Sequence, residues 1–241
     1  MDAETAYRQA IRRVAARIRE CAPADLSTRF AAAGGFDAAS YTHFEPGFEG
    51  AVCAVDGSNA IILDAGSFAI AAIRASVSAF ARGRRLYRRT TPLHVVTVNP
   101  GAGNEDFDEI FYDCFRRRPG ARLDHDDPAR NAAVIRDTLE LWSAMEMARE
   151  LDTGDLLVLD GTLQVRHASH AEVIEALLNL CNLRGVLIAA VTKRTSLTWG
   201  GGHPIVPAAE GLARGVGVAA PWYLSVSGAS GLIDRQEARA W

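Results

Sequence analysis

Residues 50–58 read GAVCAVDGS, an apolar run that ends in an aspartate, a glycine and a hydroxyl residue. Residues 156–162 repeat this arrangement as LLVLDGT. A short, continuous apolar run that ends in turn-forming residues is typical of a buried strand. Because α/β folds bind ligands at the carboxyl ends of such strands, Asp56 and Asp160 are candidate functional residues. The glycine after each aspartate would let another group approach the backbone closely.

The segments around these two runs predict an α/β fold. Helices are expected over residues 5–20, 130–151 and about 170–183, and further strands over 93–98, 186–191 and 221–226. The alternation of strands and helices after residue 130 implies parallel pairing through crossovers. A second apolar run at 61–63 follows the 50–55 strand closely, which predicts a hairpin between them. Residues 67–81 are compatible with either a helix or a strand.

The domain organisation follows from where the periodic patterns begin. Residues 22–50 show no clear period and are interpreted as a wrapping segment. We therefore expect an N-terminal helix and wrapping segment over residues 1–49 and one larger domain over residues 50–241.

Composition excludes several classes of protein. The chain has 241 residues, 49% of them hydrophobic and 23% charged, so wholesale disorder is excluded. Its net charge of −3 means that any contact with nucleic acid must come from local basic patches. The four cysteines form no CxxC pair, which argues against a zinc or redox motif and favours a reducing compartment. Without a secretory signal or a long apolar run, a cytoplasmic protein with no membrane contact is expected.

Asp56 and Asp160 predict a metal site if their strands are neighbours. Two nearby carboxylates repel each other, which raises one pKa unless a cation relieves the repulsion. Hard oxygen ligands suit Mn²⁺ or Mg²⁺. A third carboxylate would come from the predicted helix over 130–151, where Glu140 and Glu146 flank opposite sides of the apolar stripe. Helical periodicity does not choose between these two glutamates.

Basic residues add two further candidates. Lys193 is the only lysine in the chain and directly follows a thoroughly apolar strand. An ammonium group is a compact point charge that arginine does not replace, so Lys193 is a candidate for contacting a phosphate or a water. The second candidate is an arginine-rich segment that suits contacts to DNA phosphates, with Tyr87 available for stacking. It comprises Arg84, Arg85, Arg88 and Arg89, together with Arg82.

The ordered set of motifs resembles the NurA family of DNA repair nucleases. The matching segments are VDGS at 55–58, Arg136 and Glu140 on a helix, LDGTL at 159–163 and VTKRTS at 191–196. The resemblance implies an RNase H-like mixed sheet flanked by helices. It also implies an Mn²⁺-dependent 5′–3′ nuclease, a homodimer, and a HerA-type hexameric translocase as partner in the resection of double-strand breaks.

The resemblance also implies roles for individual residues. Asp56, Glu140 and Asp160 match the metal-binding acids, and Lys193 matches the lysine after the later core strand. Family members continue into a C-terminal region with a histidine near the active site. Because this chain ends at Trp241, a domain shortened at its C-terminus is expected, and the one later histidine, His203, receives no role.

Two other interpretations of the same motifs remain. Actin-type and sugar-kinase-type ATPases also place Asp-Gly-hydroxyl turns after strands, although they need two such domains and 241 residues is short. A non-catalytic NurA-like subunit that binds DNA or a translocase would keep the fold without cleaving. ATP hydrolysis would indicate the first, and DNA binding without cleavage the second.

Overall fold

A computed structural model of the chain describes residues 5, 8–9, 11–13, 26–45, 47–66, 68–98, 105–123, 127–192, 197–200 and 202–226. The chain divides into two compact units, one spanning residues 47–194 and the other combining residues 1–46 with 195–241. The described residues between 5 and 13 are helical, in agreement with the start of the predicted N-terminal helix. Residues 14–20 of that helix lie outside the described residues.

In its described residues, the larger unit contains a six-stranded mixed sheet in the order β4-β3-β2-β6-β7, with β5 beside β3. The strands are β2 (Val52–Asp64), β3 (Ala69–Ala81), β4 (Arg84–Thr90), β5 (His94–Val98), β6 (Leu156–Asp160) and β7 (Leu187–Val191). β3 is antiparallel to β2 and β4, whereas β2, β6 and β7 are mutually parallel. This is the mixed sheet expected of an RNase H-like core, so the predicted fold class is confirmed.

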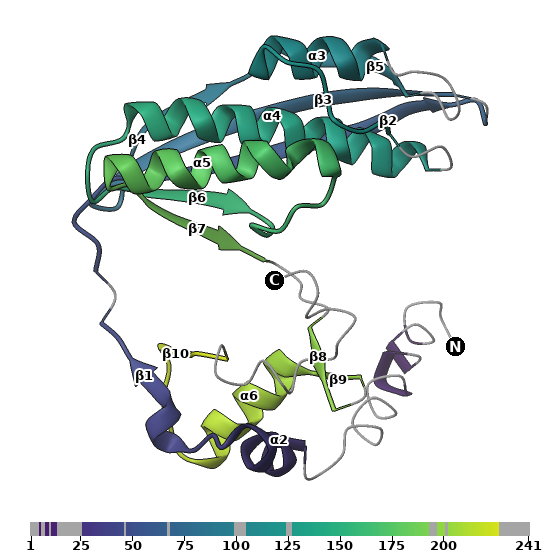
Figure 1. Ribbon diagram of the computed structural model, residues 1–241. Helices are drawn as coiled ribbons and strands as arrows, with labels where there is room; N and C mark the ends of the chain where they lie inside the picture. Colours follow the sequence, from purple (N-terminus) through teal and green to yellow (C-terminus); the bar gives the residue numbers. More distant parts are fainter. Residues whose placement is uncertain are drawn as a thin grey trace. The chain divides into compact units, whose positions relative to one another are not determined.

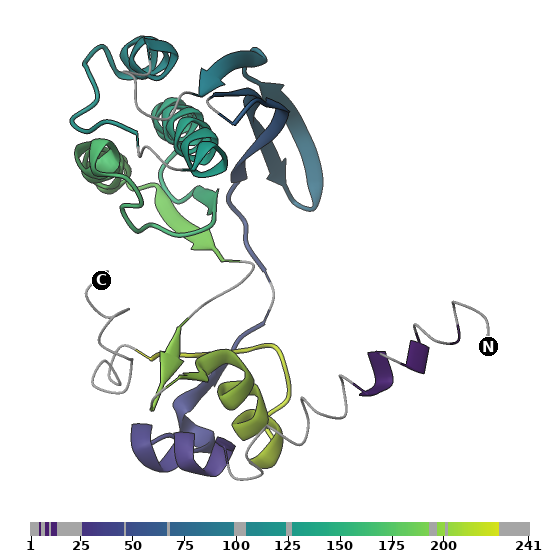
Figure 2. The ribbon, with the colours of Figure 1, turned by 90° about the vertical axis from the view of Figure 1, so that its right-hand side faces the viewer.

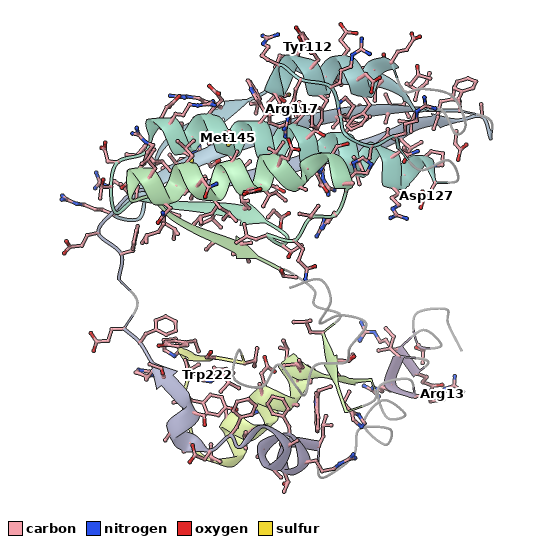
Figure 3. The ribbon with its side chains drawn as sticks, viewed as in Figure 1. Arg13, Tyr112, Arg117, Asp127, Met145 and Trp222 are labelled. Carbon is pink, nitrogen blue, oxygen red and sulfur yellow. The ribbon has the colours of Figure 1, made fainter. Side chains whose placement is uncertain are left out.

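Three helices cover one face of this sheet, as Figures 1 and 2 show: α3 (Glu105–Phe115), α4 (Pro128–Glu150) and α5 (Ala171–Arg184). α4 begins at strong start signals, because the Asp127 side chain accepts a hydrogen bond from the Arg130 amide at 3.0 Å and Pro128 opens the first turn. Asp127 is labelled in Figure 3. α5 ends at Gly185, whose φ of 68° suits a glycine.

The core lies between the sheet and the helices. Cys53 and Val55 of β2 and Leu157 and Leu159 of β6 are buried on the helix side. α4 contacts β2 and β3 on one side and α3 and α5 on the other, which explains why it is buried along most of its length. In the described part of this unit no helix covers the opposite face of the sheet (Figure 2). Because side chains alternate along a strand, that open face carries the residues between the core positions, Asp56 among them.

The predicted hairpin between residues 50–55 and 61–63 is wrong. Both runs belong to the single strand β2, which forms its hairpin with β3. Gly57 lies opposite Ala75 within that ladder, so the Asp-Gly-Ser tripeptide is extended backbone rather than a turn. The physical reason is that β3, which the sequence left open between helix and strand, offers an antiparallel partner along almost the whole length of β2.

The smaller unit has its own core, built from segments far apart in the sequence. Its elements are α2 (Leu26–Gly34), η1 (Ala38–Ser40), β1 (Tyr41–His43), β8 (Thr198–Trp199), β9 (His203–Pro204), α6 (Ile205–Gly215) and β10 (Trp222–Leu224). β10 agrees with the last predicted strand, and it pairs with β1. Residues 22–50 therefore contain regular elements rather than a wrapping loop. Their period was weak because only Phe30 of α2 is buried.

Side-chain packing fixes this small core. The Tyr41 hydroxyl donates a hydrogen bond to the Ala209 carbonyl at 2.7 Å, and its ring packs edge to face on Trp222 at 4.9 Å. Trp222 is labelled in Figure 3. None of the helices described in either unit is both long and apolar enough to cross a lipid bilayer.

His170 is a buried polar residue at the start of α5. Thr138 donates its hydroxyl proton to the Val134 carbonyl at 2.9 Å, so its oxygen can only accept from His170 Nε2, also at 2.9 Å. Nε2 of His170 therefore carries a proton. Burial, and after it the neighbouring His167, lowers the pKa of His170 from 6.5 to about 4.

This lowered pKa makes the fold sensitive to acid. The unfolded chain takes up a proton at His170 near pH 6.5, whereas the folded protein does so only near pH 4. Stability should therefore fall between these two pH values, by at most roughly 3 kcal/mol from this residue. Urea unfolding across that range should show a smaller loss for His170→Gln than for wild type, with the exposed His43→Gln as control. Identical pH profiles for wild type and His170→Gln would contradict the assignment.

Candidate active site

The two predicted aspartates occupy adjacent places on neighbouring strands. The parallel register of β2 and β6 pairs Val55 with Leu159, and Asp56 and Asp160 are the next residues of each strand. Neighbouring strands lie about 4.8 Å apart, and residues at paired positions point to the same side of the sheet. The structure therefore brings together the ends of the two motifs. Asp56 is exposed, whereas Asp160 is half-buried.

Glu140 reaches this place because Gly57 has no side chain. A Cβ at Gly57 would lie 2.3 Å from Glu140 Oε1 and 2.6 Å from Arg136 Cγ, closer than atoms can pack. α4 therefore crosses β2 in direct contact with its backbone. The glycine of the first motif is explained by this close approach of a helix, and not by a turn.

Arg136 links the acidic residues on α4 to β2. Its Nη2 donates to Asp137 Oδ1 at 2.7 Å and its Nη1 to Asn59 Oδ1 at 3.2 Å. Its Nε lies 3.2 Å from Glu140 Oε1, but the N–H is not directed at an acceptor in the described residues, so this contact is an ion pair without a well-formed hydrogen bond. The guanidinium thus balances several carboxylates at once.

Burial and a neighbouring carboxylate raise the pKa of Glu140. Burial, and then the charge of Asp137, raises this pKa from 4.5 to about 7, with a smaller contribution from Asp56. The charge of Arg136 and the Gly57 backbone amide act in the opposite direction. At neutral pH the Glu140 carboxyl is consequently close to the midpoint of its titration, and additional positive charge nearby would favour its ionised form.

A cavity of about 40 Å³ opens beside these groups. Its polar lining comprises Asp137, Glu140, Asp160, Thr162, Gln164, Arg166 and His170. Asp137 was not predicted from the sequence, although it lies three residues before Glu140 and so shares its face of the helix. That spacing was the signal that could have identified it. The loop residues carried no pattern that could have done so.

The acidic groups suit a hard divalent cation by their chemistry. Asp56, Glu140 and Asp160 offer carboxylate oxygens, the ligands preferred by Mn²⁺ and Mg²⁺. The raised pKa of Glu140 comes first from burial and then from the charge of Asp137, and a bound cation would favour the ionised carboxylate. In the described part of the chain, however, no three His, Cys, Asp or Glu side chains already converge in an arrangement that could hold a metal ion.

The other candidate residues lie elsewhere or outside the described residues. Glu146, the alternative third acid, forms an ion pair with Arg149 on α4 and does not line the cavity. Lys193 lies outside the described residues. It comes two places after Val191 of β7, the residue that pairs with Asp160 of β6. His203 belongs to β9 in the smaller unit.

The edge strand β4 carries the predicted DNA-binding residues Arg84, Arg85, Arg88 and Arg89, whereas Arg82 lies in the turn before it. The four arginines of β4 are divided between its two faces. Arg89 is opposite the buried Val77, and it pairs with Glu150 of α4 at 2.7 Å. Arg88 lies opposite Ser78, on the open face of the sheet. Beyond a register shift, Arg85 lies opposite the exposed Phe80, also on the open face, and Arg84 lies opposite Ala81.

Comparison with known proteins adds a family match. A family model described as the NurA domain matches residues 50–198, more than half of the chain. No curated protein matches the chain.

Solved NurA structures show more distant likeness. A crystal structure of NurA is 16% identical with a TM-score of 0.38, and the match covers 67% of this chain and 31% of that one. A NurA bound to dAMP and manganese is 14% identical with a TM-score of 0.36, covering 70% and 32%. The NurA nuclease from Sulfolobus solfataricus is 10% identical with a TM-score of 0.49, covering 88% and 67%. The chain spans about a third of the length of the first two.

The close approach at Gly57 predicts the effect of a single methyl group. Gly57→Ala would place a Cβ against Glu140 and the Arg136 stem, so we expect the protein to lose roughly 1–3 kcal/mol of stability as α4 is displaced. Gly120→Ala, where a Cβ would meet nothing within 4 Å, is the matched control and should be nearly neutral. Urea denaturation measures both. Equal stability of the two variants would show that α4 does not contact the β2 backbone.

Proposed function

We propose, from the premise that this chain belongs to the NurA family, that it is a nuclease that hydrolyses phosphodiester bonds of DNA with the help of Mn²⁺ or Mg²⁺. The observation that carries the proposal is the register of β2 and β6, which puts Asp56 beside Asp160 at the point where α4 brings Glu140 to Gly57. These three elements of one core would each contribute a carboxylate, the type of ligand that Mn²⁺ and Mg²⁺ prefer.

Asp56, Glu140 and Asp160 would hold the metal ions. When bound, a divalent metal supplies a water of lowered pKa and stabilises the charge that develops on the phosphate and the leaving oxygen. The protein's own groups prepare this place. Arg136 and the Gly57 amide favour the ionised form of Glu140, while burial and Asp137 oppose it. The Glu140 carboxyl can therefore exchange a proton near neutral pH, and it is held in position before any ligand arrives.

Further parts of the proposal rest on family membership alone. Lys193 would neutralise charge on the scissile phosphate or orient the attacking water. We also propose 5′–3′ degradation in the resection of double-strand breaks in the cytoplasm, a homodimeric assembly, and a HerA-type hexameric translocase as partner.

A non-catalytic DNA-binding subunit is the second candidate. It is favoured by the finding that no three potential ligands converge on a metal position in the described residues. DNA binding without cleavage in Mn²⁺, Mg²⁺ or any other divalent metal would select this function over the first.

Replacing the acids one at a time tests the nuclease. Asp56→Asn, Asp160→Asn and Glu140→Gln should each lower Mn²⁺-dependent degradation of a labelled duplex by on the order of 10³-fold, because each removes one metal ligand. Glu146→Gln, on the same helix but outside the cavity, is the matched control and should keep the wild-type rate. Thermal unfolding checks that all four variants fold. Wild-type degradation by Asp56→Asn or Asp160→Asn would reject the site.

The two faces of β4 predict different roles for its arginines. Arg85→Gln combined with Arg88→Gln should weaken DNA binding and reduce the slope of log K against log salt, by about 0.9 for each duplex phosphate that the variant no longer binds. Arg89→Gln should change the slope less, because Arg89 is already paired with Glu150. Fluorescence anisotropy with a labelled duplex across a salt series measures both slopes. A larger change in Arg89→Gln would mean that DNA contacts the helix side of this strand.

A further inference from the structure

The loop that follows β6 is fastened at both of its ends. At its start, the Gly161 amide donates to the Val191 carbonyl at 3.0 Å, and the Gly161 carbonyl accepts from the Thr192 hydroxyl. At its end, His167 Nε2 donates to the Arg122 carbonyl at 3.1 Å. The loop is therefore held between the end of β7 and the segment before α4, and its side chains take defined positions at the candidate site.

Within this loop, Arg166 folds back over Gly161. The chain turns after Thr162, whose hydroxyl accepts from the Gln164 amide at 3.1 Å. Gly161 has a φ of 102°, and a Cβ there would lie 3.1 Å from Arg166 Nη2. The second motif glycine thus permits both the backbone conformation and the return of the Arg166 guanidinium to Gly161, at the cavity that Asp160 also lines.

The two arginines near the acids differ in how much of their hydrogen-bonding capacity is used. Arg136 has 24% of its side chain exposed and lies within 3.2 Å of three different acceptors. Arg166 has 50% of its side chain exposed, and its Nη1 lies 4.0 Å from Asp137 Oδ2, the outer limit of an ion pair. Among the described residues that line the cavity, Arg166 is the one with a permanent positive charge.

We propose that Arg166 binds a backbone phosphate of the nucleic acid at this cavity, an inference that rests on the proposed function of the site. A phosphodiester that approaches Glu140 and Asp160 meets like charge, and a partly exposed guanidinium at the same cavity offsets it. The planar fork of arginine can donate two parallel hydrogen bonds to phosphate oxygens. Its loose contact with Asp137 orients the side chain without occupying these donors.

A purely structural role is the competing explanation. Arg166 would then only hold Asp137, and its loss would change stability or turnover without changing affinity for DNA. Binding measured without metal separates the two, because no cleavage takes place and the metal ligands are not occupied.

The experiment uses fluorescence anisotropy of a labelled single-stranded oligonucleotide in EDTA across a salt series. Arg166→Gln should weaken binding about fivefold to tenfold at low salt and reduce the magnitude of the salt slope by about 0.7, the value for one phosphate contact on a single strand. Arg166→Lys should keep the slope, since one charge remains, with intermediate affinity. Arg184→Gln is the control, because Arg184 lies at the C-terminal end of α5 and does not line the cavity. It should leave both the affinity and the salt slope unchanged. In Mn²⁺, Arg166→Gln should raise KM more than it lowers kcat.

The outcomes separate this inference from the proposed function. Wild-type affinity and slope in Arg166→Gln would overturn the inference, and the nuclease would still stand if Asp160→Asn abolishes cleavage. A loss of turnover with unchanged binding would likewise overturn it in favour of the structural role. If the wild-type protein binds no DNA in EDTA, the inference falls, and the nuclease is judged by Mn²⁺-dependent degradation alone.

Discussion

The direct contact between α4 and the backbone of β2 at Gly57 is the constraint on which the rest of the larger unit depends. A Cβ in that place would lie 2.3 Å from Glu140 Oε1 and 2.6 Å from Arg136 Cγ, so both side chains would have to move. Because α4 also packs on α3 and α5, its displacement would disturb the whole helix layer. The absence of a side chain at Gly57 thus determines how closely α4 packs on β2 and how near Glu140 lies to the sheet.

Charge balance is the second consequence of that contact. The approach of α4 brings Asp137 and Glu140 to the cavity that Asp160 also lines, and the Arg136 guanidinium offsets part of their charge. Its pKa is raised despite burial, because Asp137, Glu140 and Asp160 surround it. Burial, and after it the charge of Asp137, still raises the pKa of Glu140 to about 7, so Arg136 does not restore the ordinary pKa of this carboxyl. A fold that leaves this imbalance in place favours the binding of further positive charge there.

The sequence was informative where pattern and local chemistry agreed. The buried parallel strands are short apolar runs, and α4 begins at an Asp-Pro pair, so both could be predicted from residues close in sequence. The Asp-Gly-Ser tripeptide was misread in conformation, because a turn signal says nothing of the antiparallel partner that β3 supplies. The choice between Glu140 and Glu146 depended on which side of α4 meets Gly57, which is a tertiary fact. For the same reason the sequence alone could not assign the arginines of β4 to the two faces of the strand.

The core of the smaller unit joins segments from both ends of the chain, so the periodicity of any one segment could not predict it.

Strand parity and strand length together explain why the site forms where it does. Asp56 and Asp160 belong to the open face by alternation, whereas Glu140 comes from the helix side, so a continuous sheet would keep them apart. β6, however, ends at Asp160 while β2 continues to Asp64. Beyond that point β2 has no parallel neighbour among the described strands. The cavity lies where this pairing ends, and Val55 and Leu159 are among its apolar lining residues. Glu140 from the helix side and Asp160 at the end of β6 both line the cavity there. The end of one strand, rather than the acidic residues themselves, therefore determines the location of the candidate site.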